Sequence, residues 1–289
     1  MKQIAALLIV LVISSVSHAT ELKIGLIPEQ NVFKQMARYK PLGQYIEQKT
    51  GIAITFTILS RYGNIINSFS EKKLDGAFWG SFTGALAVKQ LNIEPIARPV
   101  NLDGTSTYHG YILVHKNSKI KNVSDMKGKT VAFVEKATTA GYIFPVSYFK
   151  KHGISKLDTY FKDYYFTGSH DAAIHAVLHG EADIACAKNT IFEMLVRDNP
   201  KLKDNLVIIA RSPDVPSNGL GLRKELAYGV KAELKRALLT MHKDPEGKRV
   251  LEKFGVLQFI ETTENDYAPV FDIAASAGIS LENYIYLNK

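Results

Sequence analysis

The sequence contains one cysteine in 289 residues, which excludes an intramolecular disulfide. Because this residue, Cys186, lies in an apolar stretch, we expect a small buried side chain there rather than a reactive thiol. The histidines form neither an HExxH motif nor a pairing with cysteine at metal-ligand spacing, so we expect no metal site, and no motif indicates a cofactor. The net charge of +8 comes from scattered basic pairs rather than from a run, which argues against nucleic acid as a partner.

Long hydrophobic runs are also scarce, and the longest lies at the N-terminus. Lys2 precedes an apolar run over residues 4–13, and small residues at 17–19 precede Thr20. This pattern predicts a signal peptide over residues 1–19, cleaved after Ala19, and export to the periplasm. No later stretch approaches the roughly 20 apolar residues of a membrane-spanning helix, and no cysteine stands at the cleavage position to carry a lipid. We therefore expect a free, soluble and monomeric mature protein.

Short β-rich apolar segments alternate with helical patterns along the rest of the chain. Residues 22–27, 52–59 and 77–79 read as strands. Pro41 suits the first position of a helix, and Gly51 suits the position just past its end. The alternation predicts an α/β architecture with mostly parallel sheets.

Three of the expected strands run into a helix through small or hydroxyl residues. Thr138, Thr139 and Gly141 follow one strand, Ser81 follows a second, and His170 follows a third. The first amides of a helix lack partners and carry the positive end of its dipole, so such turns bind oxyanions. Two alternatives remain open, a threonine that only caps its helix and a histidine that is only a turn residue. Because ligands bind beyond the carboxyl ends of strands in α/β sheets, the three turns can converge on one cleft.

Two similar lobes are indicated by a short internal repeat. Residues 73–78 and 181–186 both place an aspartate between a helix and a buried strand. The apolar strand 108–114 and the segment 206–219 read as two crossings between the lobes, which together form a hinge. We expect residues 20–110 and 212–289 to form lobe 1 and residues 111–211 to form lobe 2.

The chain resembles a known family in motifs that run almost from end to end. They cover residues 24–29, 74–80, 111–116, 124–129, the Thr138-Thr139 turn, 168–170 and 180–183. In these it is similar to the phosphate, phosphite and phosphonate substrate-binding proteins of ABC transporters. The resemblance implies a two-lobe, type II periplasmic-binding-protein fold, with two mixed sheets and flanking helices joined by two crossing strands. It also implies capture of a small phosphorus oxyanion for a membrane ABC permease, without enzymatic chemistry.

The resemblance also implies a set of ligand-binding residues. A Ser/Thr-rich turn at the start of a helix in the second lobe holds the phosphoryl oxygens in this family, and tyrosines, a histidine and the late link complete the site. On this sequence the set comprises Thr138, Thr139, the backbone of Ala140 and Gly141, Tyr62, Tyr108, His170, Asn218 and Lys188, to which the turn argument adds Ser81.

Two positions depart from the family pattern. Ala140 stands where a hydroxyl is common, and Lys188 stands where an acid or amide would be less surprising. Because Lys188 and Asn218 favour negative or neutral ligand groups, we expect phosphate, phosphite or a simple alkylphosphonate rather than an aminophosphonate. The alternative is that Lys188 points into solvent.

Other functions remain to be weighed. The same fold serves soluble sensors that report to a membrane receptor, and the sequence does not separate them from transport proteins. An enzyme using Ser169, His170 and Asp171 is disfavoured, because neighbours in sequence rarely face each other as a catalytic triad does. If His170 donates to the oxyanion, we expect its charged form to be favoured and affinity to fall as pH rises.

Overall fold

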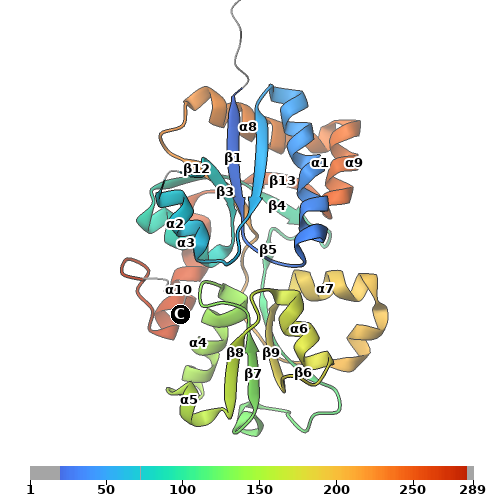
Figure 1. Ribbon diagram of the computed structural model, residues 1–289, viewed down its shortest axis with the longest axis vertical. Coiled ribbons are helices and arrows are strands. Elements are labelled where there is room, and N and C mark those ends of the chain that lie inside the picture. Colours follow the sequence, from blue (N-terminus) through green and yellow to red (C-terminus); the bar gives the residue numbers. More distant parts are fainter. Residues whose placement is uncertain (1–19, 72, 285–289) are drawn as a thin grey trace, which may run out of the picture.

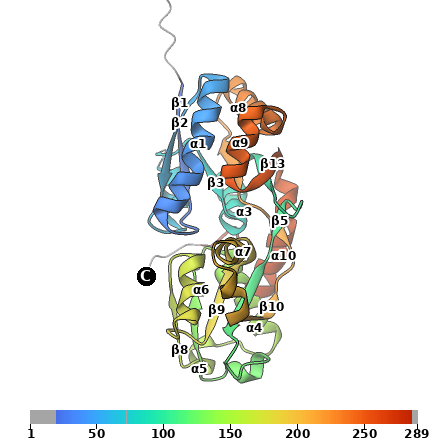
Figure 2. The ribbon, with the colours of Figure 1, turned by 90° about the vertical axis from the view of Figure 1, so that its right-hand side faces the viewer.

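The computed structural model describes residues 20–71 and 73–284, which form two lobes, one above the other in Figure 1. The signal-peptide prediction, residues 1–19, lies outside the described residues. No helix within the described ranges is both long and apolar enough to cross a membrane. Each lobe is built around one mixed sheet, and helices cover the sheet faces (Figures 1 and 2).

The first lobe contains a six-stranded sheet in the order β13-β4-β12-β3-β1-β2. Strands β1, β2 and β3 are parallel, whereas β12 and β13 pair antiparallel to their neighbours. The strands are β1 (Glu21–Leu26), β2 (Ala53–Ile58), β3 (Gly76–Trp79), β4 (Ile93–Asn101), β12 (Gly219–Arg223) and β13 (Val256–Glu261). The helices are α1 (Val32–Thr50), α2 (Asn64–Ser70), α3 (Ser81–Gln90), α8 (Tyr228–Thr240), α9 (Pro245–Phe254) and α10 (Ala268–Ala277).

The second lobe contains a five-stranded sheet in the order β10-β6-β9-β7-β8. Its strands are β6 (Gly110–His115), β7 (Thr130–Phe133), β8 (Asp163–Phe166), β9 (Ile184–Lys188) and β10 (Leu206–Arg211). Its helices are α4 (Phe144–Lys151), α5 (Leu157–Tyr160), α6 (His170–Leu178) and α7 (Asn189–Asp198), with a π-helical turn at Thr139–Ile143 and short 3-10 turns at Val123–Met126 and Pro200–Asn205. Cys186 is buried in β9 with a free thiol, as expected.

Helix α1 begins earlier than the sequence pattern predicts. Asn31 accepts hydrogen bonds from the amides of Phe33 and Lys34 and so caps the helix, which then continues through Pro41. The prediction that Pro41 opens the helix is therefore wrong. The carbonyl that the proline leaves without a helical partner belongs to Ala37, an exposed residue, so water can satisfy it. Gly51 ends the helix as expected, with φ at 72° in the left-handed region.

The internal repeat has a structural counterpart. Asp75 accepts a hydrogen bond from the Lys23 amide at 2.8 Å, and its own amide donates to the Lys23 carbonyl. Asp183 makes the same two contacts with Thr130, its carboxylate accepting from the amide at 2.9 Å. Asp75 thus joins the start of β3 to its parallel neighbour β1, and Asp183 joins the start of β9 to its parallel neighbour β7. The two lobes share one local design.

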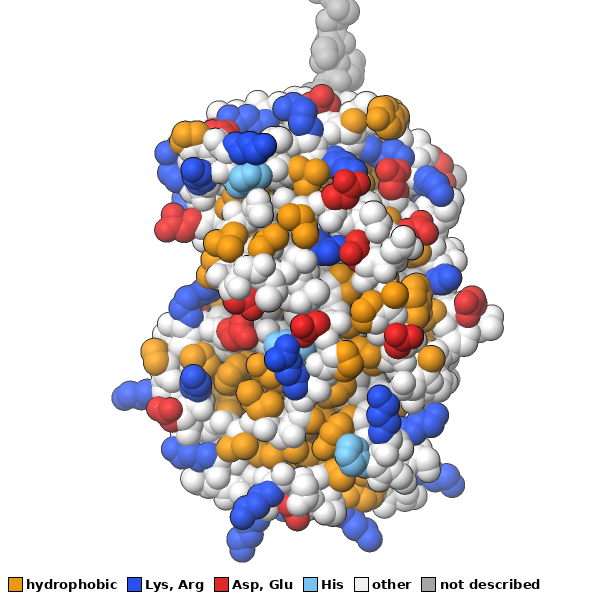
Figure 3. Space-filling model, turned by 180° about the vertical axis from the view of Figure 1, so that it is seen from behind, with side chains coloured by type: hydrophobic (Ala, Val, Ile, Leu, Met, Phe, Trp, Pro, Cys, Tyr) orange, Lys and Arg blue, Asp and Glu red, His pale blue; other side chains and the backbone are white. Residues whose placement is uncertain are grey.

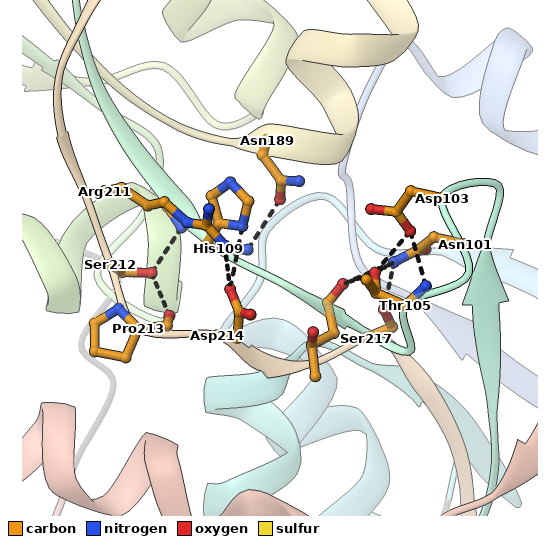
Figure 4. A network of polar contacts seen from close by, with 12 residues as sticks. Asn101, Asp103, Thr105, His109, Asn189, Arg211, Ser212, Pro213, Asp214 and Ser217 are labelled. Carbon is orange, nitrogen blue, oxygen red and sulfur yellow. Dashed lines mark hydrogen bonds and ion pairs between the residues drawn. The ribbon is translucent and has the colours of Figure 1, made fainter.

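Two chain segments cross between the lobes and pair with each other. The predicted strand 108–114 is interrupted at His109, which separates β5 (Thr107–Tyr108) from β6. β5 pairs antiparallel with β11 (Val215–Pro216), which follows β10 along the second crossing. Polar contacts secure these crossings (Figure 4): His109 Nδ1 lies 3.3 Å from Asp214 Oδ1, and the Gly110 amide donates to Ser212 Oγ at 2.8 Å.

Helix α10 packs against α4 of the second lobe as well as α3 of the first. One apolar core, formed under α1, α8 and α9, stays within the first lobe. The other core runs from α2 and α3 through α10 into the second lobe. We keep the division into 20–110 with 212–289 and 111–211 as a proposal, with α10 as the helix that joins the two parts.

The face opposite that of Figure 1 carries interspersed basic and acidic side chains, and hydrophobic side chains gather on its lower lobe (Figure 3). The outer strand β10 contributes half-exposed Val207 and Ile208 to the surface of that lobe.

Candidate ligand-binding site

Three helix starts meet between the lobes and surround a small buried cavity. Helix α3 follows β3, the π-helical turn follows β7, and α6 follows β8. The cavity has a volume of about 10 Å³, room for one water-sized group. Of the predicted site residues, it is lined by Tyr62, Ser81, Tyr108, Thr138, Thr139, His170, Lys188 and Asn218. The residues that the family resemblance and the turn argument named therefore do lie around one cavity.

Ala140 and Gly141 are buried beside this cavity without lining it. A Cβ atom at Gly141 would lie 2.5 Å from the Val134 Cβ and 2.7 Å from the Thr138 Oγ1, so only glycine lets the turn fold back on its strand. The first hydrogen bond of the turn runs from the Ile143 amide to the Thr138 carbonyl. The amides of residues 139–142 precede this first hydrogen bond and therefore do not donate within the turn. They are the groups that a helix start offers to an anion.

Three hydroxyl groups form a chain across the cleft. Ser81 Oγ of the first lobe lies 2.6 Å from Thr139 Oγ1 of the second lobe and 2.6 Å from the Tyr108 hydroxyl in the crossing. Burial raises the pKa of Tyr108 to about 12, so its hydroxyl keeps its proton at neutral pH. All three groups can donate to an acceptor placed between them.

The Thr138 hydroxyl has a different role from that of Thr139. It donates to the Glu135 carbonyl at 2.6 Å, and the Thr138 side chain caps no amide of the helix. The alternative in which Thr138 is a side-chain N-cap is therefore wrong. Its hydroxyl proton is already engaged, so Thr139 rather than Thr138 presents a donor to the cavity.

Two buried donors on the cavity wall lack a hydrogen-bond partner anywhere in residues 20–71 and 73–284. They are the Tyr62 hydroxyl and the Asn218 amide nitrogen Nδ2. Burial raises the pKa of Tyr62 well above its ordinary value, so this hydroxyl is a neutral donor. Unpaired buried donors cost about 1–3 kcal/mol each, and a ligand with acceptor oxygens in this cavity would satisfy both.

His170 is a neutral imidazole in this structure at neutral pH, and the expectation that a bound oxyanion favours its charged form stays a prediction about the complex. Burial and the nearby Lys188 lower the pKa of His170 to about 3. Its Nδ1 accepts a hydrogen bond from the Lys188 amide at 3.2 Å, so the ring proton lies on Nε2. His170 can donate one hydrogen bond to a ligand in this state, without a positive charge.

Lys188 points into the site rather than into solvent, so the alternative of a solvated lysine is wrong. Its side chain is 7% exposed, and Nζ donates to Glu29 Oε1 at 2.8 Å and to Asn218 Oδ1 at 3.1 Å. Burial opposes the charge of Glu29, but the charge and hydrogen bond of Lys188, together with the Arg38 charge, lower the Glu29 pKa below its ordinary value. The pair is an ionised salt bridge between the lobes.

Glu29 is the site residue that sequence reasoning missed. It follows β1 just as Ser81 follows β3, and it ends the 24–29 motif, so its place beyond a strand was a usable signal. Gln35 accepts from its amide at 3.1 Å, which fixes the backbone beside the cavity. A carboxylate therefore stands in the site, and Lys188 neutralises it.

Ser169, His170 and Asp171 are not arranged as a catalytic triad. Ser169 Oγ is hydrogen-bonded to Asp171, whereas the His170 ring faces the Lys188 amide. The imidazole therefore does not lie between the hydroxyl and the carboxylate, which is the order that a nucleophile, base and orienting acid require.

A family model described as the periplasmic substrate-binding protein of a phosphonate ABC transporter matches residues 24–267. The chain belongs to this family. The resemblance drawn from the sequence motifs is thereby confirmed, and the family is one of transporter components rather than enzymes.

Individual relatives agree with this assignment. The phosphonates-binding periplasmic protein of Escherichia coli is 28% identical over 269 residues, which cover 90% of this chain and 79% of the relative. A probable ABC transporter phosphite-binding protein of Prochlorococcus marinus, PhnD1, is 24% identical and covers 89% of this chain and 90% of the relative.

Solved structures confirm the expected fold class. The binding-protein component of an ABC phosphonate transporter from Pseudomonas aeruginosa has a TM-score of 0.83 at 23% identity, over 90% of this chain and 87% of the other. The structure of P. marinus PhnD1 in complex with methylphosphonate has a TM-score of 0.79 at 22% identity, over 90% of this chain and 99% of the other.

Proposed function

We propose that this protein captures a small phosphorus oxyanion, a phosphonate, phosphite or phosphate, in the cavity between its lobes. The signal-peptide pattern supports cleavage after Ala19 and action in the periplasm, as a monomer that delivers the closed complex to a membrane ABC permease. The names of its relatives support the ligand class, since one binds phosphonates, one is described as binding phosphite, and the PhnD1 structure holds methylphosphonate.

The observation that carries the proposal is the convergence of donors on one buried space. Tyr62 and Asn218 offer hydrogens without acceptors, and the Ser81, Thr139 and Tyr108 hydroxyls currently satisfy one another. A tetrahedral oxyanion inserted between the lobes would exchange these mutual contacts for charge-assisted ones, which are stronger. The cavity itself is small, so binding requires the lobes to part and close again around the ligand.

A thermal-shift panel tests the ligand class. Methylphosphonate, phosphite or phosphate at about 100 times its dissociation constant should stabilise the protein by roughly 2.7 kcal/mol. Sugars, amino acids and sulfate should give little change. A shift with a sugar or amino acid and none with a phosphorus oxyanion would end the proposal, and turnover of a phosphonate would favour an enzyme.

The variant Tyr62→Phe ties the function to the unpaired donors. Removing an unsatisfied hydroxyl should leave the free protein as stable as the wild type or more stable by about 1 kcal/mol. The same change should weaken binding of the best oxyanion in the panel by about tenfold or more, since a hydrogen bond to a charged group is lost. Urea unfolding and calorimetry on both proteins measure the two effects. Unchanged affinity in Tyr62→Phe would show that Tyr62 does not face the ligand.

A further inference from the structure

The Lys188 ammonium is enclosed by three groups that the protein brings from other elements. Glu29 Oε1 lies 2.8 Å from Nζ, Asn218 Oδ1 lies 3.1 Å away, and the centre of the Tyr108 ring lies 4.2 Å away. A carboxylate, an amide oxygen and an aromatic face are the groups with which proteins bind an ammonium ion. The first lobe and the crossing thus build an ammonium site, and the second lobe fills it with its own side chain.

Lys188 is held in this position along its whole length. Its backbone is the last paired residue of β9, opposite Gly110, and its amide donates to His170. The side chain is 7% exposed, so most of its surface is enclosed by the surrounding protein groups. Glu135, the other buried acid among the described residues, does not line the cavity, and no second carboxylate there is available to a ligand.

The enclosed ammonium also stands at the exit of the small cavity. Glu29, Lys188 and Asn218 line this cavity, and the same three residues line a groove of about 970 Å³ between α1 and α7. A substituent on the bound oxyanion that extends toward the groove must therefore pass the Lys188–Glu29 pair.

We propose that Lys188 acts as a tethered ammonium that sets the substrate class, admitting phosphorus oxyanions whose substituent is absent or uncharged and rejecting those whose substituent carries an amine. The inference rests on the proposed function, because it concerns the same cavity. A ligand ammonium would find the Glu29 carboxylate already neutralised and would lie beside a like charge, an arrangement that proteins use to exclude wrong partners. Because the Glu29–Lys188 pair is neutral overall, its net charge does not exclude a cation; the exclusion comes from occupancy of the carboxylate and from the short distance to the Lys188 ammonium.

A matched pair of ligands tests this inference. Propylphosphonate and 2-aminoethylphosphonate have the same chain length and differ by a methyl group against an ammonium group. Calorimetry should show the wild type binding propylphosphonate at least about 100-fold more tightly. In Lys188→Ala, which uncovers Glu29 and Asn218, the order should reverse by about tenfold or more. Lys188→Arg, which keeps a cation in place, should retain the wild-type order, and Lys188→Ala with Glu29→Gln should lose the reversal.

A second measurement does not depend on phosphonate binding. Propylammonium supplies the atoms that Lys188→Ala removes, so it should raise the thermal midpoint of that variant and leave the wild type and the Lys188→Ala/Glu29→Gln variant unchanged. If Lys188→Ala does not fold, Lys188→Met retains most of the stem and serves for the ligand-order comparison.

The outcomes separate the two proposals. Equal binding of the two phosphonates by the wild type, the wild-type order kept in Lys188→Ala or Lys188→Met, or no response of Lys188→Ala to propylammonium would overturn the tethered-ammonium inference alone. Failure of methylphosphonate, phosphite and phosphate to bind the wild type would overturn the proposed function instead.

Discussion

Two adjacent threonines in this site make different hydrogen bonds. Thr138 and Thr139 look equivalent in the sequence, yet the Thr138 hydroxyl donates to the Glu135 carbonyl whereas the Thr139 hydroxyl reaches Ser81 across the cleft. The direction of each hydroxyl follows from the π-helical turn, which begins between the two residues. One threonine stabilises the turn and its neighbour contributes to the cavity.

Two isosteric substitutions separate these duties. Thr139→Val should weaken oxyanion binding by about 10- to 100-fold, the equivalent of a hydrogen bond to a charged group. Thr138→Val should lower the free energy of unfolding by about 1 kcal/mol and change affinity by less than about threefold. Calorimetry and urea unfolding on the same two variants measure both quantities. Equal losses of affinity in the two variants would contradict the assignment of ligand binding to Thr139 and of turn stability to Thr138.

The elements around the site are strands that end in tight turns, and the turn after β7 depends on one glycine. Any side chain at Gly141 would collide with Val134 and Thr138, so the amides of this turn stay in place only while residue 141 lacks a Cβ. Strand starts are fixed as firmly, because Asp75 and Asp183 each join two parallel strands by paired hydrogen bonds. Gly141 thus shapes the turn at the end of β7, and the two aspartates join strands at the opposite, starting ends.

Gly141→Ala tests the glycine requirement at the level of the turn. The overpacked methyl group should lower the free energy of unfolding by about 1–3 kcal/mol and should weaken oxyanion binding as the turn shifts. Gly229→Ala is the matched control, since a Cβ there meets no atom within 4 Å, and alanine should stabilise helix α8 by about 0.5–1 kcal/mol. Wild-type stability and affinity in Gly141→Ala would contradict the packing argument.

At the scale of the whole molecule, closure buries ionisable groups contributed by both lobes. Glu29 and Lys188 meet from opposite sides, and His170 is enclosed beside them as a neutral ring. The His170 pKa of about 3 in the folded protein lies below its unfolded value of about 6.5. The unfolded chain therefore binds more protons in this interval, and the stability that His170 contributes is complete above pH 6.5 and is lost as pH falls toward 3.

The pH dependence of unfolding measures this burial. Between pH 6 and 4.5 the wild type should lose stability with a His170 contribution of up to about 1.4 kcal/mol per pH unit. His170→Gln, which cannot take up a proton, should show a correspondingly shallower slope in urea titrations over the same range. Identical slopes for the two proteins would show that the imidazole is hydrated rather than buried.

The sequence predicted what is local and missed what depends on distant contacts. Strand-to-helix turns are read from neighbouring residues, and Ser81, Thr139 and His170 were placed correctly around one space for that reason. The start of α1 was misplaced because Pro41 gave a stronger signal than the Asn31 cap. Glu29 could have been found from its place beyond β1, but its contact with Lys188 joins residues 159 positions apart and the burial of His170 depends on both lobes, so neighbouring residues could not predict either.

The position of α10 indicates the side on which the two lobes can part. This helix packs on both lobes beside the crossings, whereas α1 and α7 face each other over the groove on the other side of the interface (Figure 1). On that side of the interface the lobes are joined by the exposed Lys34–Asp198 ion pair, by the Asn31 amide, which donates to Asp171 at 3.0 Å, and by the buried Lys188–Glu29 pair. The exposed contacts among these are weak. We therefore expect the lobes to part on the side of α1 and α7, with α10 and the two crossings on the hinge side, and we expect a ligand to enter between α1 and α7.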